Sequence, residues 1–215
     1  MRASTTALAI LSLLELSAAA PTPVELAPRC GATLFPFLTQ QLTEENPTTV
    51  NINTLEYDGD FYVSQKMDPA TGALSNRIYQ VVAFNNIPPG SYGCQLNVVF
   101  PNPYPITTTG SPTLNVYTLY NGSPSSITYP NNWSWDTFFP RTSPPFGQGL
   151  YGTINFAQGQ NAAINSEACP ANGGDLAFVF EIADWVWGSA SIEFNEYVNK
   201  LTGAGLAGVY LTYNC

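Results

Sequence analysis

The sequence contains no histidine among its 215 residues. Histidine is the general base of Ser-His-Asp and Cys-His catalysis, a common zinc ligand and the side chain that titrates near neutral pH. Its absence excludes these mechanisms, which serve most common enzymes. No other catalytic motif is recognisable and we expect no cofactor, so the favoured interpretation is a protein that is not an enzyme.

Positive charge is also scarce, because 6 Lys and Arg residues stand against 15 Asp and Glu residues and give a net charge of −9. Such a chain repels nucleic-acid phosphates and anionic membrane surfaces, so we expect neither as a partner. The apolar fraction of 45% is ordinary for a globular protein, but charged residues make up only 10%, where about 25% is usual. Thr, Ser and Asn supply most of the polar side chains instead.

Residues 1–19 have the pattern of a secretory signal peptide. A positive residue precedes an apolar stretch at 7–14 that is too short to span a bilayer, and small residues suit cleavage after residue 19. We predict that 20–29 form a flexible lead-in and that 30–215 form a single domain. The protein is therefore expected to be secreted and to act in the extracellular space or at the cell wall.

Four cysteines, Cys30, Cys94, Cys169 and Cys215, form an even set without a C-x-x-C spacing. In an exported chain this favours two structural disulfides over a thiol or metal site. Four cysteines allow three connectivities, and the sequence alone does not choose among them. Because chain ends are often neighbours in a domain, we favour Cys30–Cys215 together with Cys94–Cys169.

Two N-glycosylation sequons begin at Asn121 and Asn132, both in sequence rich in turn-forming residues. A third candidate at Asn46 is void because Pro47 occupies the middle position. We therefore expect a glycoprotein with Asn121 and Asn132 as the glycan sites.

Alternating apolar residues predict about nine β-strands. The predicted strands are 50–55, 61–65, 78–84, 94–100, 114–119, 151–156, 176–182, a stretch around Ile192 and Phe194, and 208–213. The mature chain has no long helical pattern, although 34–45 could form a turn or two of helix. Residues 124–149 carry five prolines and are predicted to be a long surface loop. The expected fold is all-β, an antiparallel β-sandwich of jelly-roll type with two disulfides.

Six short segments occur in an order that matches a known family. They are Cys30-Gly31, Gly90-Ser91-Tyr92-Gly93-Cys94-Gln95-Leu96, Tyr104-Pro105-Ile106-Thr107, Leu114-Asn115-Val116-Tyr117, Ile164-Asn165-Ser166-Glu167-Ala168-Cys169 and Leu211-Thr212-Tyr213-Asn214-Cys215. Their order and the cysteine positions resemble the fungal ubiquitin-3-binding protein But, C-terminal domain family over essentially the whole mature chain. The resemblance implies a secreted, disulfide-linked β-sandwich of uncharacterised activity. The family name implies ubiquitin-like machinery, but that machinery is cytosolic or nuclear, so we do not expect it as a partner of a secreted chain.

Carboxylates are the only side chains that could support an enzyme here, because a glycoside hydrolase needs two of them facing each other. The candidates are Glu56, Asp58, Asp60, Asp136, Glu181 and Asp184. We favour the simpler interpretation that these are solvated acids of turns and strands. Glu56, Asp58 and Asp60 could also offer oxygen ligands to Ca²⁺, but the segment lacks EF-hand spacing. An acidic turn is the better interpretation, and no metal site is predicted.

The four tryptophans form two pairs, Trp133/Trp135 and Trp185/Trp187, each spaced two residues apart. Residues two apart on an extended chain point the same way, so each pair could be a flat platform on which a sugar ring stacks. For Trp133/Trp135 we favour packing onto the sandwich, because two phenylalanines follow. For Trp185/Trp187, the parity of the preceding strand predicts exposure. That pair could then bind a ligand or pack under 124–149, and packing is the favoured alternative.

These observations lead to one favoured hypothesis and one alternative. The favoured hypothesis is a secreted, non-catalytic β-sandwich with a binding or structural role at the cell wall or in the extracellular space. Its expected partner is a cell-wall polysaccharide or an extracellular protein, with the four tryptophans as candidate contacts. The alternative is an extracellular enzyme resembling a glycoside hydrolase that works through a carboxylate pair.

Overall fold

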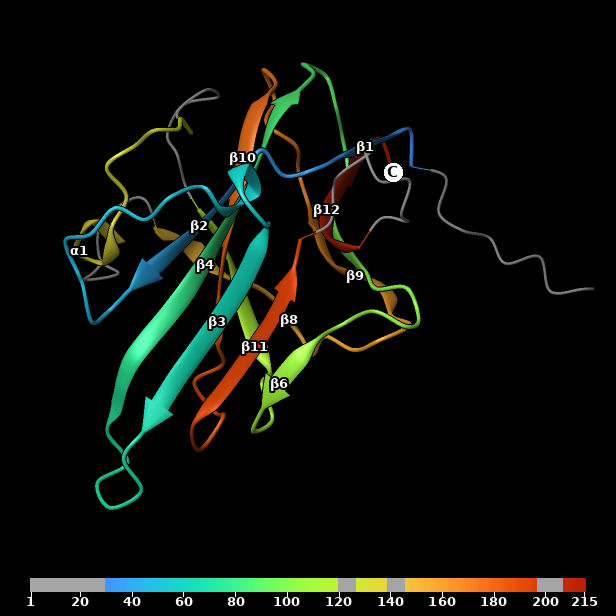
Figure 1. Ribbon diagram of the computed structural model, residues 1–215. Coiled ribbons are helices and arrows are strands. Elements are labelled where there is room, and N and C mark those ends of the chain that lie inside the picture. The colour runs from blue at the N-terminus through green and yellow to red at the C-terminus, as the bar shows by residue number, and fades with distance from the viewer. Residues whose placement is uncertain (1–29, 120–126, 139–145, 197–206) are drawn as a thin grey trace, which may run out of the picture.

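The computed structural model describes residues 30–119, 127–138, 146–196 and 207–215 (Figure 1). The predicted signal peptide, the lead-in and the sequon at Asn121 lie outside these residues. The described strands are β1 (Ala32–Leu34), β2 (Leu38–Thr43), β3 (Asp60–Met67), β4 (Leu74–Ile87), β5 (Cys94–Val99), β6 (Thr107–Thr109), β7 (Leu114–Leu119), β8 (Phe146–Ile154), β9 (Asn161–Glu167), β10 (Gly174–Ile182), β11 (Ala190–Asn195) and β12 (Gly208–Tyr213). The described helices are the 3-10 helix η1 (Thr54–Glu56) and the α-helix α1 (Trp135–Phe138), and neither is long and apolar enough to cross a bilayer.

The strands form two antiparallel sheets that pack into a β-sandwich, as the sequence predicted. One sheet has the order β1-β12-β5-β9, and the other contains the run β4-β10-β7-β8, which together give the eight-stranded arrangement of a jelly roll. The second sheet continues beyond β4 through β3, β11 and β6, while β2 also pairs with β4. Figure 1 shows β6, β11, β3 and β4 side by side. This extension carries the candidate site described below.

The main core lies between the two sheets and is rich in phenylalanine. Phe61 stacks on Phe194 with ring centroids 4.4 Å apart and meets Phe180 edge-on at 5.2 Å. The even-numbered residues of β10 face this core, as the alternation in the sequence predicted. Inward-facing apolar side chains on alternate positions of both sheets thus explain why these segments form strands.

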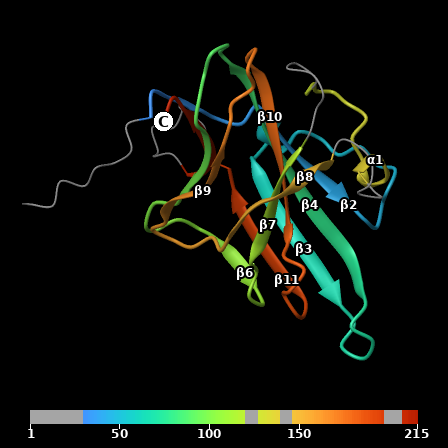
Figure 2. The same cartoon turned by 180° about the vertical axis from the view of Figure 1, so that it is seen from behind.

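A second, smaller core covers the outer face of the longer sheet. Leu38 and Leu42 of β2 and Tyr79 of β4 pack there against Trp135 and Phe138 of α1. Figure 1 and Figure 2 show α1 and β9 on opposite sides of the longer sheet. The predicted surface loop at 124–149 is therefore corrected, because its described residues include a helix that buries large apolar side chains.

Both disulfides have the favoured connectivity, Cys30–Cys215 and Cys94–Cys169. The first joins the ends of the paired strands β1 and β12, and the second joins the start of β5 to the chain just beyond β9. Each bond therefore holds two segments of the same sheet together.

Two further predicted segments have a different structure, and β6 and β9 are strands that were not predicted. The predicted strand at 50–55 is not a strand, because only Asn53 makes a bridge, to Gln40, and η1 follows at once. Asn53 caps η1 through its side chain, which accepts a hydrogen bond from the Leu55 N–H at 3.3 Å. The predicted helical turn at 34–45 is instead occupied by β2 and part of β1. Tertiary pairing with β4 outweighs local propensity there.

Candidate functional site

The two exposed tryptophans lie in the loop between β10 and β11. Trp185 is 60% exposed and Trp187 is 82% exposed, so the predicted exposure is confirmed. Val186, between them, packs against the core between the sheets. The favoured alternative, burial of this pair under 124–149, is wrong for the residues that the structure describes. We call residues 183–189 the indole loop.

Hydrogen bonds from β3 hold the indole loop in place. The buried Gln65 side chain donates through Nε2 to the carbonyls of Val186 at 3.1 Å and Gly188 at 3.0 Å. The Met67 N–H donates to the Ser189 hydroxyl at 3.0 Å. The indoles are thus exposed on a backbone that is fixed at several points, which reduces the entropy lost when a ligand binds.

The Trp187 ring also lies against the turn of the β3–β4 hairpin. A Cβ added to Gly72 would lie 3.0 Å from the Trp187 ring, and Gly72 has a φ of +71°, which only glycine adopts freely. Glycine at this turn lets the indole lie close to the hairpin backbone.

The other tryptophan pair does not form a platform. Trp135 is only 6% exposed, and its ring lies 4.9 Å from that of Tyr79 and 5.0 Å from the Arg77 guanidinium. Trp133 is half-buried and meets Phe138 edge-on at 5.5 Å. The favoured packing interpretation is confirmed, and the candidate binding role of this pair is withdrawn.

Asn132, next to Trp133, is exposed, so its side chain is accessible to the glycosylation machinery. Glycosylation of Asn132 remains a prediction.

The candidate carboxylates are scattered. Asp136 and Asp184 are exposed, and Glu181 is buried on the outer face of β10, opposite Asn115 of β7. Asp60 has two acidic neighbours, Glu193 and Asp58. Burial raises the pKa of the Asp60 carboxyl most, and the negative charges of these neighbours raise it further.

The acidic turn before β3 does not gather its side chains into a metal site. Asp58 accepts the N–H of Asp60 at 3.2 Å, and the carboxylate of Asp60 accepts a hydrogen bond from Gln41 at 3.1 Å. Glu56 is exposed. Within the described ranges, no three Asp, Glu or Cys side chains lie together as metal ligands. The calcium alternative for Glu56, Asp58 and Asp60 therefore has no geometric support.

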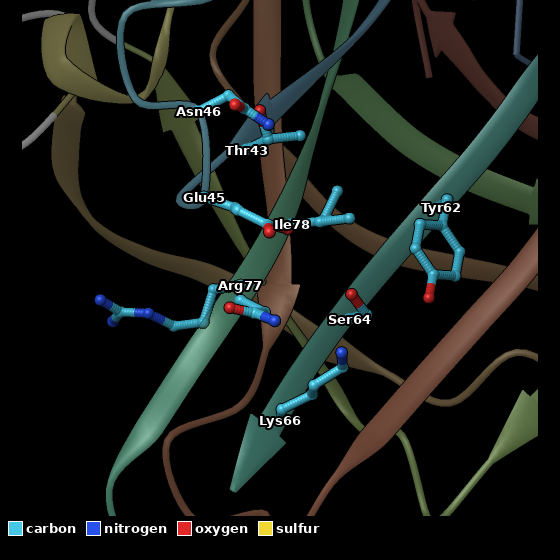
Figure 3. Close-up of a pocket in the computed structure, with 9 residues that line it drawn as sticks. Thr43, Glu45, Asn46, Tyr62, Ser64, Lys66, Arg77 and Ile78 are labelled. Carbon is cyan, nitrogen blue, oxygen red and sulfur yellow. The ribbon is translucent and has the colours of Figure 1, made fainter.

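A pocket of about 340 Å³ lies on the outer face where β2 and β3 diverge from β4. Its lining residues are Thr43, Glu45, Asn46, Tyr62, Ser64, Lys66, Asn76, Arg77 and Ile78. Figure 3 shows Tyr62, Ser64 and Lys66 in a row along β3. The sequence does not reveal this pocket, because its residues come from three separate segments, none of which carries a motif.

Several buried carboxyl groups hold protons more tightly than usual. Glu196 follows β11 and is buried, with both carboxylate oxygens accepting the Val209 N–H at 2.7 and 3.0 Å. Burial raises the pKa of Glu196 well above its ordinary value. Burial also raises the pKa values of Glu167 and Asp175. The folded protein therefore favours the protonated form of these groups.

We expect a higher melting midpoint at about pH 4.5 than at about pH 7.5. A carboxyl group whose pKa is raised by folding keeps its proton to a higher pH in the folded state than in the unfolded state. The free energy of unfolding therefore falls as the pH rises from the ordinary pKa of 4.5 through the raised pKa. Glu44 acts in the opposite sense, because its hydrogen bond to Arg77 lowers its pKa, but that stabilisation fades only below 4.5. Thermal melts at the two pH values, repeated with Glu196→Gln, test this, and the variant should show the smaller difference. A higher midpoint at about pH 7.5 would contradict it.

A comparison with protein-family models found none that matches the chain, and a comparison with curated proteins found no match either. The resemblance to the But C-terminal domain family therefore remains a prediction.

Proposed function

We propose that this protein is a secreted, non-catalytic β-sandwich that binds carbohydrate in the extracellular space or at the cell wall, through Trp185 and Trp187. The observation that carries the proposal is the exposure of two indoles, spaced two residues apart, on a loop that Gln65 holds by two hydrogen bonds. Exposed apolar patches mark interaction sites, and an indole combines a flat apolar face with one polar group. That combination suits the C–H face of a sugar ring.

Secretion is supported by the covalent structure and by the N-terminal sequence pattern. Two disulfides with no free cysteine are typical of proteins that fold in oxidising compartments. The proposed membership in the But C-terminal domain family agrees with this location. The acidic composition leaves a neutral polysaccharide as a partner that the protein does not repel.

The test is retention on insoluble cell-wall polysaccharides, together with a glycan array, using secreted protein with its disulfides intact. We expect Trp185→Ala/Trp187→Ala to lose retention while its free energy of unfolding changes by less than about 1 kcal/mol, because exposed side chains contribute little to stability. Tyr57→Ala is the matched control, since Tyr57 is an exposed aromatic at 72% that lies outside the indole loop. Retention of the double variant at the wild-type level would refute the proposal.

The glycoside-hydrolase alternative is supported by one observation, the raised pKa of Asp60 beside Glu193 and Asp58. Two carboxyl groups with different proton affinities can serve as the acid and the base of hydrolysis. Incubation of the same polysaccharides with wild type and with Asp60→Asn separates the two functions. Release of reducing sugars by wild type alone would replace the binding proposal with the enzymatic one.

A further inference from the structure

The pocket between β2, β3 and β4 brings together the two basic residues of the part of the chain that the structure describes. Within the described ranges, Lys66 and Arg77 are the only Lys or Arg residues, and both line this pocket. The same ranges carry thirteen Asp and Glu residues. Two cations at one pocket are therefore a local departure from the character of the whole surface.

The two cations have different roles. Arg77 is committed to Glu44, whose carboxylate accepts from its Nη2 at 2.5 Å and from its Nε at 3.1 Å. Figure 3 shows the Arg77 guanidinium turned away from Lys66. Lys66 is exposed and forms no ion pair with a carboxylate of the described chain, and Figure 3 shows its ammonium directed along β3 toward Ser64. Lys66 is thus the cation available to a ligand.

The rest of the lining is rich in polar groups that suit a hydroxyl-rich ligand. Hydroxyls from Thr43, Tyr62 and Ser64 and amides from Asn46 and Asn76 offer both donors and acceptors. The Tyr62 ring and the Ile78 side chain add apolar surface. The volume of about 340 Å³ is near the lower end of the range for small-molecule sites, roughly 300–1,000 Å³.

The charge of the pocket limits the acid group of the ligand to a single negative charge. One available ammonium at Lys66 balances one carboxylate, whereas the second charge of a phosphate would be repelled by the carboxylate of Glu45, which also lines the pocket. Glu45 is exposed and can accept hydrogen bonds from sugar hydroxyls.

We propose that this pocket binds one acidic sugar residue, a uronic acid that is either free or at the end of a chain. Its carboxylate contacts Lys66, its hydroxyls contact the polar lining, and a C–H face lies on Tyr62. The site is separate from the indole loop and does not depend on the proposed function of Trp185 and Trp187.

The experiment is an NMR titration of the isotope-labelled protein with glucuronic acid, with glucose as the neutral counterpart and inorganic phosphate as the competing anion. We expect glucuronic acid to shift the amide signals of β3 and to bind about tenfold more tightly than either other probe. Lys66→Gln should reduce the affinity for glucuronic acid about tenfold and leave glucose unchanged, while Lys66→Arg should keep most of the preference. Equal binding of glucose, tighter binding of phosphate, or an unchanged preference in Lys66→Gln would each overturn the proposal.

Two further titrations test the ligand and the independence of the site. A trisaccharide that ends in glucuronic acid distinguishes the end of a chain from the free sugar by its higher affinity. Trp185→Ala/Trp187→Ala should bind glucuronic acid as wild type does, so that failure of the indole-loop function and failure of this proposal can be told apart. Lys66 is exposed, and the melting midpoint of its variants should stay at the wild-type value.

Discussion

Trp135→Ala is expected to lower the free energy of unfolding by about 3–5 kcal/mol, as for other buried aromatic side chains. The Trp135 ring fills the small core between α1 and the outer face of the longer sheet, against Tyr79 and under the Arg77 guanidinium. Removing it leaves a cavity that a four-residue helix cannot close by shifting, because its backbone is tied to Pro47 through the Asp136 N–H at 2.9 Å.

Denaturant unfolding at pH near neutrality measures this effect directly. Trp185→Ala is the matched control, because it removes the same side chain from an exposed position and should change the free energy of unfolding by less than about 0.5 kcal/mol. A loss below about 1 kcal/mol in Trp135→Ala would show that the outer core does not contribute as described.

Replacing Cys94 and Cys169 by alanine is expected to lower the free energy of unfolding by about 4 kcal/mol. The disulfide closes a loop with a sequence separation of 75 residues, for which the chain-entropy model gives about 4.5 kcal/mol. Cys94 is also fully buried in the main core, so its sulfur contributes packing as well as the covalent link. The bond ties β5 to the end of β9, the edge strand of the smaller sheet.

The measurement compares the double alanine variant with wild type in urea and in thermal melts, after mass spectrometry has verified the state of the remaining disulfide. Wild type with both bonds verifiably reduced should unfold at a still lower midpoint. An unchanged midpoint after loss of the Cys94–Cys169 bond would contradict a structural role for it.

The parts of the fold that the sequence predicted well are those where one face of a strand is buried and the other is not. β11 shows this, since Ala190, Ile192 and Phe194 are buried while Glu193 and Asn195 are exposed. In β10 both faces are buried, although its even-numbered residues lie in the main core as predicted. β2 was missed because Thr39 and Gln40 are polar and yet fully buried, so its alternation is hidden. The hydroxyls of Thr39 and Thr54 form a hydrogen bond of 2.6 Å, and the local sequence around Thr39 does not reveal this partner.

In the candidate site, too, contacts between residues distant in sequence decided what the sequence could not predict. The exposure of Trp185 and Trp187 was predicted, but β10 ends at Ile182 and Glu181 on the same face is fully buried, so the parity of β10 does not account for it. Their packing under 124–149 was the wrong alternative, because α1 in that segment packs against β2 and β4. The pocket at Lys66 was beyond sequence reasoning, since pairing between β3 and β4 and the divergence of β2 create it.

The central claim is that Trp185 and Trp187 form the binding surface, and iodide quenching of tryptophan fluorescence tests it most directly. Trp135 is buried and Trp133 half-buried, so the exposed pair should dominate the quenchable signal, which Trp185→Ala/Trp187→Ala should remove. A soluble fragment of a retained polysaccharide should protect wild-type fluorescence from iodide. Protection of wild type and none in the variant is the predicted result, whereas a polysaccharide that binds wild type without protecting the exposed indoles would contradict the account.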